Sequence, residues 1–358
     1  MSPLNISPRT GMKCLPAAKL YESNGIAIHD WHAEVLTLRA FNHFLLREAR
    51  TLALDPSATS PYLRRRPSTE IAPSQPQPFA WNDALTLHMY CSEAPCGDAS
   101  MELVMAAQDD ASPWDLPSSL TSPPPTENPS LPGRGYFSQL GVVRRKPARG
   151  DAPPSLSKSC SDKIALKQCT SLLNSLSSLL ISPWHVYLTS LILPEPQYSA
   201  VACHRCFSAE EGGRMAGIKG KQWGESGYGF VPFRVETTKE EFVFSKRAVA
   251  ARTEKTSASN LAVVWTANGV EEGLVGGVLQ GRKQFVPKGA SVVSRRGMWK
   301  LSSEVAALTG GFESVSEGTY GGVKGGSLLE TRREVKEHVR GGALKGWVRN
   351  TGGDAFGL

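Results

Sequence analysis

Two residues near the start of the chain, His32 and Glu34, have the types and the spacing for metal and proton chemistry. An imidazole is a common metal ligand, and a carboxylate can accept and return a proton. An apolar repeat with helical spacing follows them, consisting of Val35, Leu38, Phe41 and Leu45. We therefore predict a helix over residues 31–50, with Asp30 capping its first turn. The simpler alternative is a capped helix start with a surface glutamate, because such triplets also arise by chance.

Two cysteines also stand beside predicted helix starts. Cys96 lies in a Pro-Cys-Gly turn after a strand predicted over residues 85–90, and Asp98 is placed to cap the helix that follows. Cys160 lies in a polar turn ahead of a helix predicted over residues 163–181. A purely structural cysteine is unexpected in such polar turns, which favours a chemical role for both.

One histidine and two cysteines form a donor set that suits zinc and leaves a fourth position for water, as in catalytic sites. We predict His32, Cys96 and Cys160 as zinc ligands and Glu34 as the residue that moves protons. A histidine ligand two residues before such a glutamate is the first half of the zinc nucleobase-deaminase motif. The closely spaced second half is absent, so the third ligand must come from far along the chain. Cys91 and Cys169 remain alternatives for it, although neither lies in a polar turn.

The composition limits the class of protein. The 358 residues can bury a large core in one or two domains. The net charge is +7, and the excess lies after residue 151, where 26 Lys and Arg face 18 Asp and Glu. This part of the chain is the better candidate for contact with a polyanion, and the equally weighted alternative is that the charge only keeps the protein soluble. Seven cysteines without a repeated spacing, and no apolar leader, indicate a reducing compartment rather than secretion. The most apolar stretch, residues 172–193, is interrupted by polar residues and predicts core rather than a membrane span.

The remaining pattern predicts further elements and loops. Strands are predicted over residues 186–193, 242–244 and 261–266. A charged helix is predicted over residues 328–339, after a glycine-rich loop at 310–326. Two Pro-rich insertions, at about residues 56–80 and 111–135, are predicted to be disordered. Cys203 and Cys206 have the spacing of a zinc pair, but without a second pair we interpret it as coincidence.

Three ordered motifs carry a resemblance to a known family: Asp30-Trp31-His32-Ala33-Glu34, Pro95-Cys96-Gly97-Asp98 and Ser159-Cys160-Ser161-Asp162-Lys163. They resemble the deaminase domain shared by adenosine deaminases acting on RNA and the eukaryotic tRNA-specific adenosine deaminases, and the fungal members of the tRNA branch most of all. The resemblance extends from Arg145-Lys146-Pro147 to Gly346-Trp347-Val348, so it covers nearly the whole chain. No segment resembles a double-stranded RNA-binding domain.

The resemblance implies a single editase domain over residues 8–350, with a three-layer α/β/α core like that of cytidine deaminases and a long C-terminal extension. It implies zinc at the three predicted ligands, Glu34 as proton shuttle, and conversion of adenosine to inosine in RNA. In the tRNA branch the implied target is the adenosine 3′ of the anticodon in alanine tRNA, an unpaired base that is easier to extrude than one in a duplex. Lys13 is the implied phosphate contact. The implied location is the nucleus or cytoplasm, without a membrane partner.

The family also implies a buried inositol hexakisphosphate. By position, Arg39, Lys163, Arg295 and Trp347 match its contacts, and Asp30 matches a residue that links this site to the zinc. A densely charged anion would make buried lysines and arginines possible. Without the resemblance, these residues would be interpreted as surface cations. Some relatives have further arginines where this chain has Leu38 and Leu166, so the number of contacts stays open.

Two departures from the family leave alternatives open. Met12 replaces the usual threonine of the Thr-Gly-Thr-Lys-Cys motif, and residues 1–7 are a short N-terminus. A truncated gene model is one interpretation, and a catalytically inactive RNA-binding paralogue is another. A free-nucleoside or cytidine deaminase is the third, and it ranks last because such enzymes are shorter and use closely spaced cysteines.

Overall fold

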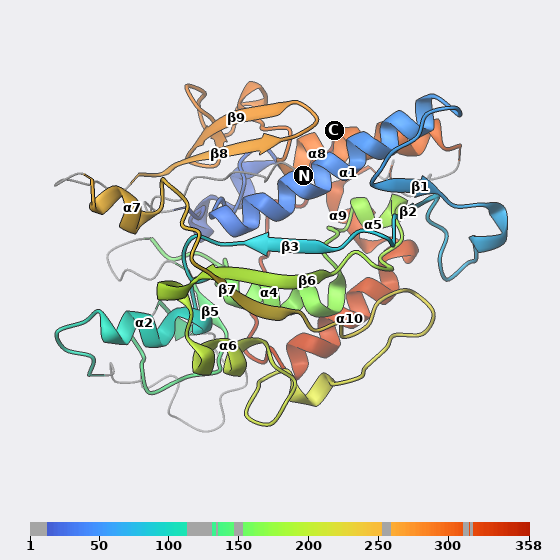
Figure 1. Ribbon diagram of the computed structural model, residues 1–358. Coiled ribbons are helices and arrows are strands. Elements are labelled where there is room, and N and C mark those ends of the chain that lie inside the picture. Colours follow the sequence, from blue (N-terminus) through green and yellow to red (C-terminus); the bar gives the residue numbers. More distant parts are fainter. Residues whose placement is uncertain are drawn as a thin grey trace.

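In the computed structural model, a three-stranded parallel sheet crosses the middle of the molecule and lies between helices (Figure 1). Its strands, in the order β3-β6-β7, are β3 (Leu87–Tyr90), β6 (Leu188–Pro194) and β7 (Arg234–Thr238). The structure describes residues 13–112, 131–133, 135–146, 153–252, 259–310, 315 and 318–358. The predicted α/β class, with a sheet between helices, is confirmed.

The central strand β6 is an apolar run that is largely buried, as its position between two parallel neighbours requires. The strands predicted over residues 85–90 and 186–193 are therefore confirmed. Because the three strands run in the same direction, their carboxyl ends share one edge of the sheet. The chain leaves β3 at this edge and enters the loop that contains Cys96.

Helix α1 (Ala33–Leu54) confirms the helix predicted from the apolar repeat. Its first half packs in a smaller core through Leu36 and Ala40, and its second half packs in the main core through Leu45 and Leu46. Contacts with two separate cores fix the position of α1 and of the residues at its start.

The single helix predicted over residues 163–181 is wrong, because the chain forms two shorter helices there. They are α4 (Cys160–Thr170) and α5 (Ser177–Leu180). Ser171 takes a left-handed φ of 55° and ends α4, and the next amide pairs with the segment before β6 instead of continuing the helix. The apolar periodicity runs through this break, so the pattern alone gives no sign of it.

The Pro-rich segment 56–80 has a defined structure, so the prediction of a disordered insertion there is wrong. It contains β1 (Leu63–Arg65), which pairs antiparallel with β2 (Phe79–Trp81). The buried guanidinium of Arg66 donates to the carbonyls of Gln75 and Gln77 and so gathers the loop around itself. Composition does not reveal this arginine's role. The second predicted insertion, 111–135, lies mostly outside the described residues.

The chain after β7 adds an antiparallel sheet in the order β10-β9-β8 and several helices. The strands are β8 (Leu261–Thr266), β9 (Val270–Val275) and β10 (Val278–Leu279). The helices are α7 (Lys246–Ala250), α8 (Arg295–Leu308), α9 (Tyr320–Gly325) and α10 (Glu330–Gly341). The predictions of a strand at 261–266 and of a helix near 328–339 are confirmed. The strand predicted at 242–244 does not form, and the segment 310–326, predicted to be a glycine-rich loop, contains helix α9, so both predictions are wrong.

Two further α-helices, α2 (Met101–Ala106) and α6 (Ala200–Phe207), and the short parallel pair β4 (Leu131–Pro132) and β5 (Arg144–Arg145) complete the α-helices and strands of the described chain. Helix α4 contacts both α6 and α10, below the sheet in the view of Figure 1. Among the described residues, no helix has the length and apolar character needed to cross a membrane.

Candidate active site

The three side chains predicted as zinc ligands meet at one point. His32 is the N-cap residue of α1, Cys96 lies in the loop after β3, and Cys160 is the first residue of α4. One ring nitrogen and two sulfurs lie within 4.8 Å of one another. Nδ1 of His32 is 3.8 Å from Sγ of Cys96. The fold thus brings together donors that are far apart in the sequence.

This spacing fits a tetrahedral ion. Zinc lies about 2.3 Å from a thiolate and about 2.0 Å from an imidazole nitrogen, so neighbouring donors around it are roughly 3.5–3.8 Å apart. The distance between Cys96 and His32 has this length. Two sulfurs and an imidazole suit zinc better than magnesium or calcium, and three protein donors leave one position open.

The two cysteine loops approach closely because residue 97 is glycine. Gly97 has a φ of 109°, and a Cβ there would lie 2.2 Å from Oγ of Ser159. The backbone N–H of Cys160 donates to Sγ of Cys96 at 3.4 Å, and that of Ser161 donates to the Cys96 carbonyl at 3.0 Å. The start of α4 therefore supplies amide donors to the first sulfur, which favours its thiolate form.

Gly97→Ala is expected to weaken zinc binding at least about 10-fold, because the second shell of a metal site tolerates little displacement. The left-handed backbone alone costs about 1–3 kcal/mol for alanine, and the overlap with Ser159 adds to this cost. Zinc retention during dialysis and thermal unfolding would measure both effects. Gly217→Ala is the control, because a Cβ at Gly217 meets no heavy atom within 4 Å. Unchanged zinc affinity in Gly97→Ala would show that the close approach is not needed.

The buried Lys146 connects the sulfurs to Asp30. Its Nζ is 3.1 Å from Sγ of Cys160 and 2.8 Å from Oδ2 of Asp30, which also accepts hydrogen bonds from Ser157 and Lys163. Burial lowers the pKa of Lys146, but Asp30 and Cys160 outweigh burial, and the net pKa is raised well above its usual value. A permanent cation beside the sulfur favours the thiolate of Cys160 as a ligand.

The ionisable groups of the cluster are strongly coupled. The pKa of Cys96 is held well below its usual value by a hydrogen bond from Cys160, against the effect of burial. Burial, and then Cys96, raise the pKa of Cys160. Burial and Lys146 lower the pKa of His32, but the sulfur of Cys96 and a hydrogen bond with Cys14 help to raise it to about 10. Because zinc binds thiolates and neutral imidazole, metal binding must release protons here.

Glu34 lies on the first turn of α1, two residues after His32. Burial is the largest influence on the pKa values of Lys13, Cys91 and Cys160, and the negative charge of Glu34 acts on all three. The carboxylate therefore lies beside the cysteine cluster without belonging to the group of metal-type donors. Lys13 lies next to it, held by the hydrogen bond from the backbone N–H of Trp31 to the Lys13 carbonyl at 2.9 Å.

The capping roles predicted for two aspartates are wrong. The N-cap of α1 is His32, and Asp30 accepts a hydrogen bond from the His32 amide at 3.1 Å, so it orients the histidine rather than the helix turn. Asp98 is buried and pairs with Arg205 instead of capping a helix. In both cases the carboxylate pairs with a cation that is distant in the sequence, whereas the local pattern predicted that it would cap a helix.

Two residues of the site were missed by the sequence reasoning. Lys146 stands in the Arg145-Lys146-Pro147 motif that carries part of the resemblance, but its contact with Asp30 spans 116 positions and has no local sign. Cys14 forms a second possible donor group with Asp30 and His32. Its place after Lys13 in a Gly-x-Lys-Cys motif was the available signal.

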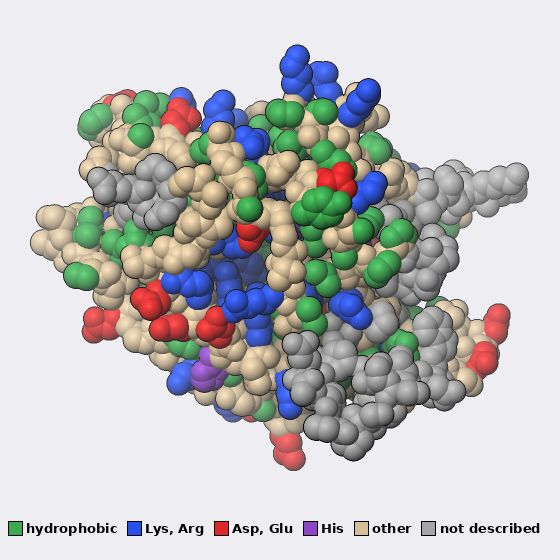
Figure 2. Space-filling model, turned by 180° about the vertical axis from the view of Figure 1, so that it is seen from behind, with side chains coloured by type: hydrophobic (Ala, Val, Ile, Leu, Met, Phe, Trp, Pro, Cys, Tyr) green, Lys and Arg blue, Asp and Glu red, His purple; other side chains and the backbone are tan. Residues whose placement is uncertain are grey.

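The cations predicted to bind a polyphosphate, Arg39, Lys163 and Arg295, are half-buried and lie near one another. Burial and the charges of Arg295, Arg39, Lys324 and Lys163, in this order, lower the pKa of His29 well below its usual value, so these cations surround one imidazole. The ring of Trp347 is contacted by Lys158, at 5.7 Å from its centroid, and by Arg340, at 4.9 Å. Figure 2 shows Lys and Arg side chains gathered in a hollow on the face opposite to that of Figure 1.

The comparison with known proteins identifies the family. The sequence model of the adenosine-deaminase (editase) domain matches residues 7–351. The chain belongs to this editase family. The tRNA-specific adenosine deaminase 1 of Schizosaccharomyces pombe is 34% identical over 352 residues, which are 97% of this chain and 82% of that protein. Its namesake in Saccharomyces cerevisiae is 35% identical over 191 residues, 53% of this chain and 46% of that protein.

A more distant relative within the editase family is the double-stranded RNA-specific editase Adar of Drosophila melanogaster, which is 27% identical over 225 residues. These cover 58% of this chain and 30% of that protein. An editase deaminase domain implies a zinc site, and His32, Cys96 and Cys160 form a group able to hold the ion.

Proposed function

We propose that this editase-family protein is a zinc-dependent tRNA adenosine deaminase, which hydrolyses adenosine to inosine. The observation that carries the proposal is the convergence of His32, Cys96 and Cys160 beside the carboxylate of Glu34. The S. pombe relative, which is 34% identical over 97% of this chain, is a tRNA-specific adenosine deaminase and supports tRNA as the substrate. The seven free cysteines suit a reducing compartment, and we propose the nucleus or the cytoplasm.

In this proposal each residue has one role. His32, Cys96 and Cys160 hold zinc, which when bound lowers the pKa of a water molecule towards neutrality. Glu34 takes a proton from the attacking water, delivers it to the ring nitrogen of adenine, and then protonates the departing amine. The water oxygen bonds to C6, the C6–N bond breaks, and ammonia leaves. Lys146 stays protonated and fixes the sulfur of Cys160.

We further propose that the target is the adenosine 3′ of the anticodon in alanine tRNA. The test incubates the purified protein with an unmodified alanine tRNA transcript and reads A-to-G changes by sequencing. A transcript with guanosine at that position is the matched control. An unmodified loop, with zinc bound to the protein, would count against deamination. Binding of the tRNA without deamination would favour the alternative of an inactive RNA-binding protein. Met12, the substitution that suggested this alternative, lies outside the described residues.

Lys13→Met is expected to weaken tRNA binding and to reduce the salt dependence of binding by about one phosphate contact. Burial lowers the pKa of Lys13 to about 8, while Glu34 opposes this shift. The charge needed for a phosphate contact is thus present below pH 8 and lost above it. Wild-type affinity should fall as the pH rises through 8, and the variant should lack this step. Titration of labelled tRNA at several pH values would measure it; identical pH profiles for the two proteins would contradict the role.

We also propose that inositol hexakisphosphate binds among the interior cations. Lys158 is only 2% exposed, and its Nζ donates to a backbone carbonyl. Lys167 and the buried Arg332 also donate to backbone carbonyls. Like charges held this closely in an interior need a compensating anion, and phosphate groups accept strong hydrogen bonds from them. Lys163, one of the cations around His29, contacts Asp30, and Asp30 contacts Lys146, which in turn contacts Cys160.

A concentration of inositol hexakisphosphate that is 100 times its Kd at pH 7 is expected to stabilise protein freed of bound anion by about 2.7 kcal/mol at that pH, and the same concentration by less at pH 9. Burial and three neighbouring cations lower the pKa of Lys158 from 10.5 to about 7. Without the anion, this folded-state pKa below the unfolded value makes stability rise with pH between 7 and 10.5. Anion binding favours the protonated lysine and opposes that trend.

Thermal unfolding with and without the anion, at pH 7, 8 and 9, would measure this effect. Unphosphorylated inositol is the control and should not shift the melting temperature. A shift of equal size at every pH, or no shift at all, would contradict the proposed anion site.

A further inference from the structure

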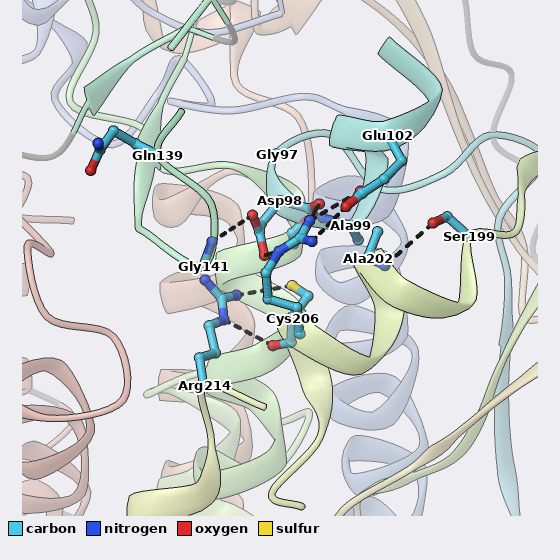
Figure 3. A network of polar contacts seen from close by, with 12 residues as sticks. Gly97, Asp98, Ala99, Glu102, Gln139, Gly141, Ser199, Ala202, Cys206 and Arg214 are labelled. Carbon is cyan, nitrogen blue, oxygen red and sulfur yellow. Dashed lines mark hydrogen bonds and ion pairs between the residues drawn. The ribbon is translucent and has the colours of Figure 1, made fainter. Parts of the chain in front are cut away.

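A polar network lies behind the two cysteine loops, and part of it is drawn in Figure 3. In each loop the residue two positions after the cysteine is an aspartate, Asp98 after Cys96 and Asp162 after Cys160. Both carboxylates are completely buried. A buried carboxylate needs a partner, and each of these has an arginine.

The two arginines come from one short stretch of chain. Nε of Arg205, on α6, is 3.0 Å from Oδ2 of Asp98, and Nη1 of Arg214 is 2.6 Å from Oδ1 of Asp162. The backbone N–H of Arg214 donates to the carbonyl of Arg205 at 3.0 Å, which joins the two residues directly. We call α6 and residues 208–214 the arginine clamp.

Further contacts fix the arginine clamp in place. Arg214 donates to the carbonyl and to Sγ of Cys206, at 2.8 and 3.1 Å (Figure 3). Arg205 also pairs with Glu102 on α2, and Oδ1 of Asp98 accepts the N–H of Gly141 at 2.9 Å. Each guanidinium therefore has its orientation set by several acceptors, and a planar guanidinium transmits that orientation to its carboxylate.

The chain itself does not set the distance between the two sulfurs. Cys96 and Cys160 are 64 positions apart, and one long segment of the chain connects the two loops. The loops contact each other through Ser161, whose Oγ donates to the carbonyl of Pro95 at 2.9 Å. The arginine clamp provides a further connection, which is shared by both loops.

We propose that Arg205 and Arg214 are positioning residues for the two cysteine ligands, acting through Asp98 and Asp162. The inference rests on the proposed zinc site. The arginine clamp sets how far apart the sulfurs lie and how they are oriented, and hence the affinity and the coordination geometry of the metal. It acts from behind the site and has no contact with substrate in this role.

The test uses the full chain with Co²⁺ as the probe, because its absorption bands report both the sulfur ligands and their geometry. Arg205→Met and Arg214→Met are expected to weaken Co²⁺ and Zn²⁺ binding about 10- to 100-fold in competition with a chelator, and to change the Co²⁺ bands. Arg214→Lys keeps the charge and should recover part of the affinity. If Arg214→Met fails to fold, Arg205→Met carries the test, since its arginine is the more exposed of the two.

Arg66→Met is the matched control. Arg66 is also a buried arginine that donates to backbone carbonyls, but it lies in the β1–β2 loop and contacts neither cysteine loop. Its loss should cost stability and leave the Co²⁺ bands and affinity unchanged. Wild-type affinity and bands in both clamp variants, or the same metal loss in Arg66→Met, would overturn the inference. Failure of the wild-type protein to show sulfur-to-Co²⁺ bands would instead overturn the proposed metal site.

Discussion

Glu34→Gln protein is expected to keep about one zinc ion per chain and to deaminate tRNA about 10²- to 10⁴-fold more slowly than the wild type, the range for loss of a general acid–base group. The amide has nearly the shape of the carboxylate but cannot accept and return a proton. Glu34 supplies no atom to the His32, Cys96 and Cys160 donor group, so zinc should stay bound. Single-turnover deamination and metal analysis of the same preparation would measure the two effects.

Glu48→Gln is the control for this result. Glu48 lies on the same helix α1, fourteen positions further on, which is about 21 Å along the helix axis. Its carboxylate accepts a hydrogen bond from Ser60 at 2.7 Å, and an amide oxygen can still accept it. Normal turnover is expected. Loss of zinc in Glu34→Gln would make Glu34 structural, and retained activity would require another proton carrier.

Cys160→Ala is expected to hold less than about a tenth of the wild-type zinc and to unfold at a lower temperature. The change removes a donor of the site and takes away the sulfur that lies 3.1 Å from Nζ of Lys146. A buried cation that loses a partner is destabilising, and the metal no longer links the loops. Metal analysis and thermal unfolding, each with and without a chelator, would measure the effect.

Cys169→Ala is a closely matched control for Cys160→Ala. Both cysteines lie on α4, and both are completely buried. Burial raises the pKa of Cys169 to about 12, as expected for a packing thiol. Among the described residues, Cys169 belongs to no group of metal-type donors, so its replacement should leave zinc content unchanged. The same zinc loss in both variants would show that the ligand assignment is wrong.

The donor residues were predictable because each carries a local sign. His32 precedes an amphipathic helix, Cys96 lies between a proline and a glycine, and Cys160 follows a serine that caps α4. The partners that hold these loops were not predictable in the same way. Lys146, Arg205 and Arg214 reach their carboxylates across 116, 107 and 52 positions, and no local pattern records such pairings.

The errors in secondary structure have a similar origin. Apolar periodicity continues past Ser171, where a left-handed residue divides the predicted helix into α4 and α5. Proline and serine in residues 56–80 suggested disorder, but the buried Arg66 satisfies the loop carbonyls. In both cases particular hydrogen bonds, from Leu172 to Val186 and within the loop around Arg66, overrode the preference indicated by the sequence pattern.

The last residues of the described chain pack against residues 20–29, the segment that precedes α1. The ring of Phe356 occupies the space where a Cβ of Gly25 would be, and the carbonyl of Gly353 accepts a hydrogen bond from Arg295. Residues 353–356 emerge from the ribosome roughly 320 residues after His32, a delay of about 16–64 s at 5–20 residues per second. During translation, residues 20–29 therefore lack their C-terminal packing partner for that time. We therefore expect nascent chains to expose this surface to chaperones until residues 353–356 have emerged.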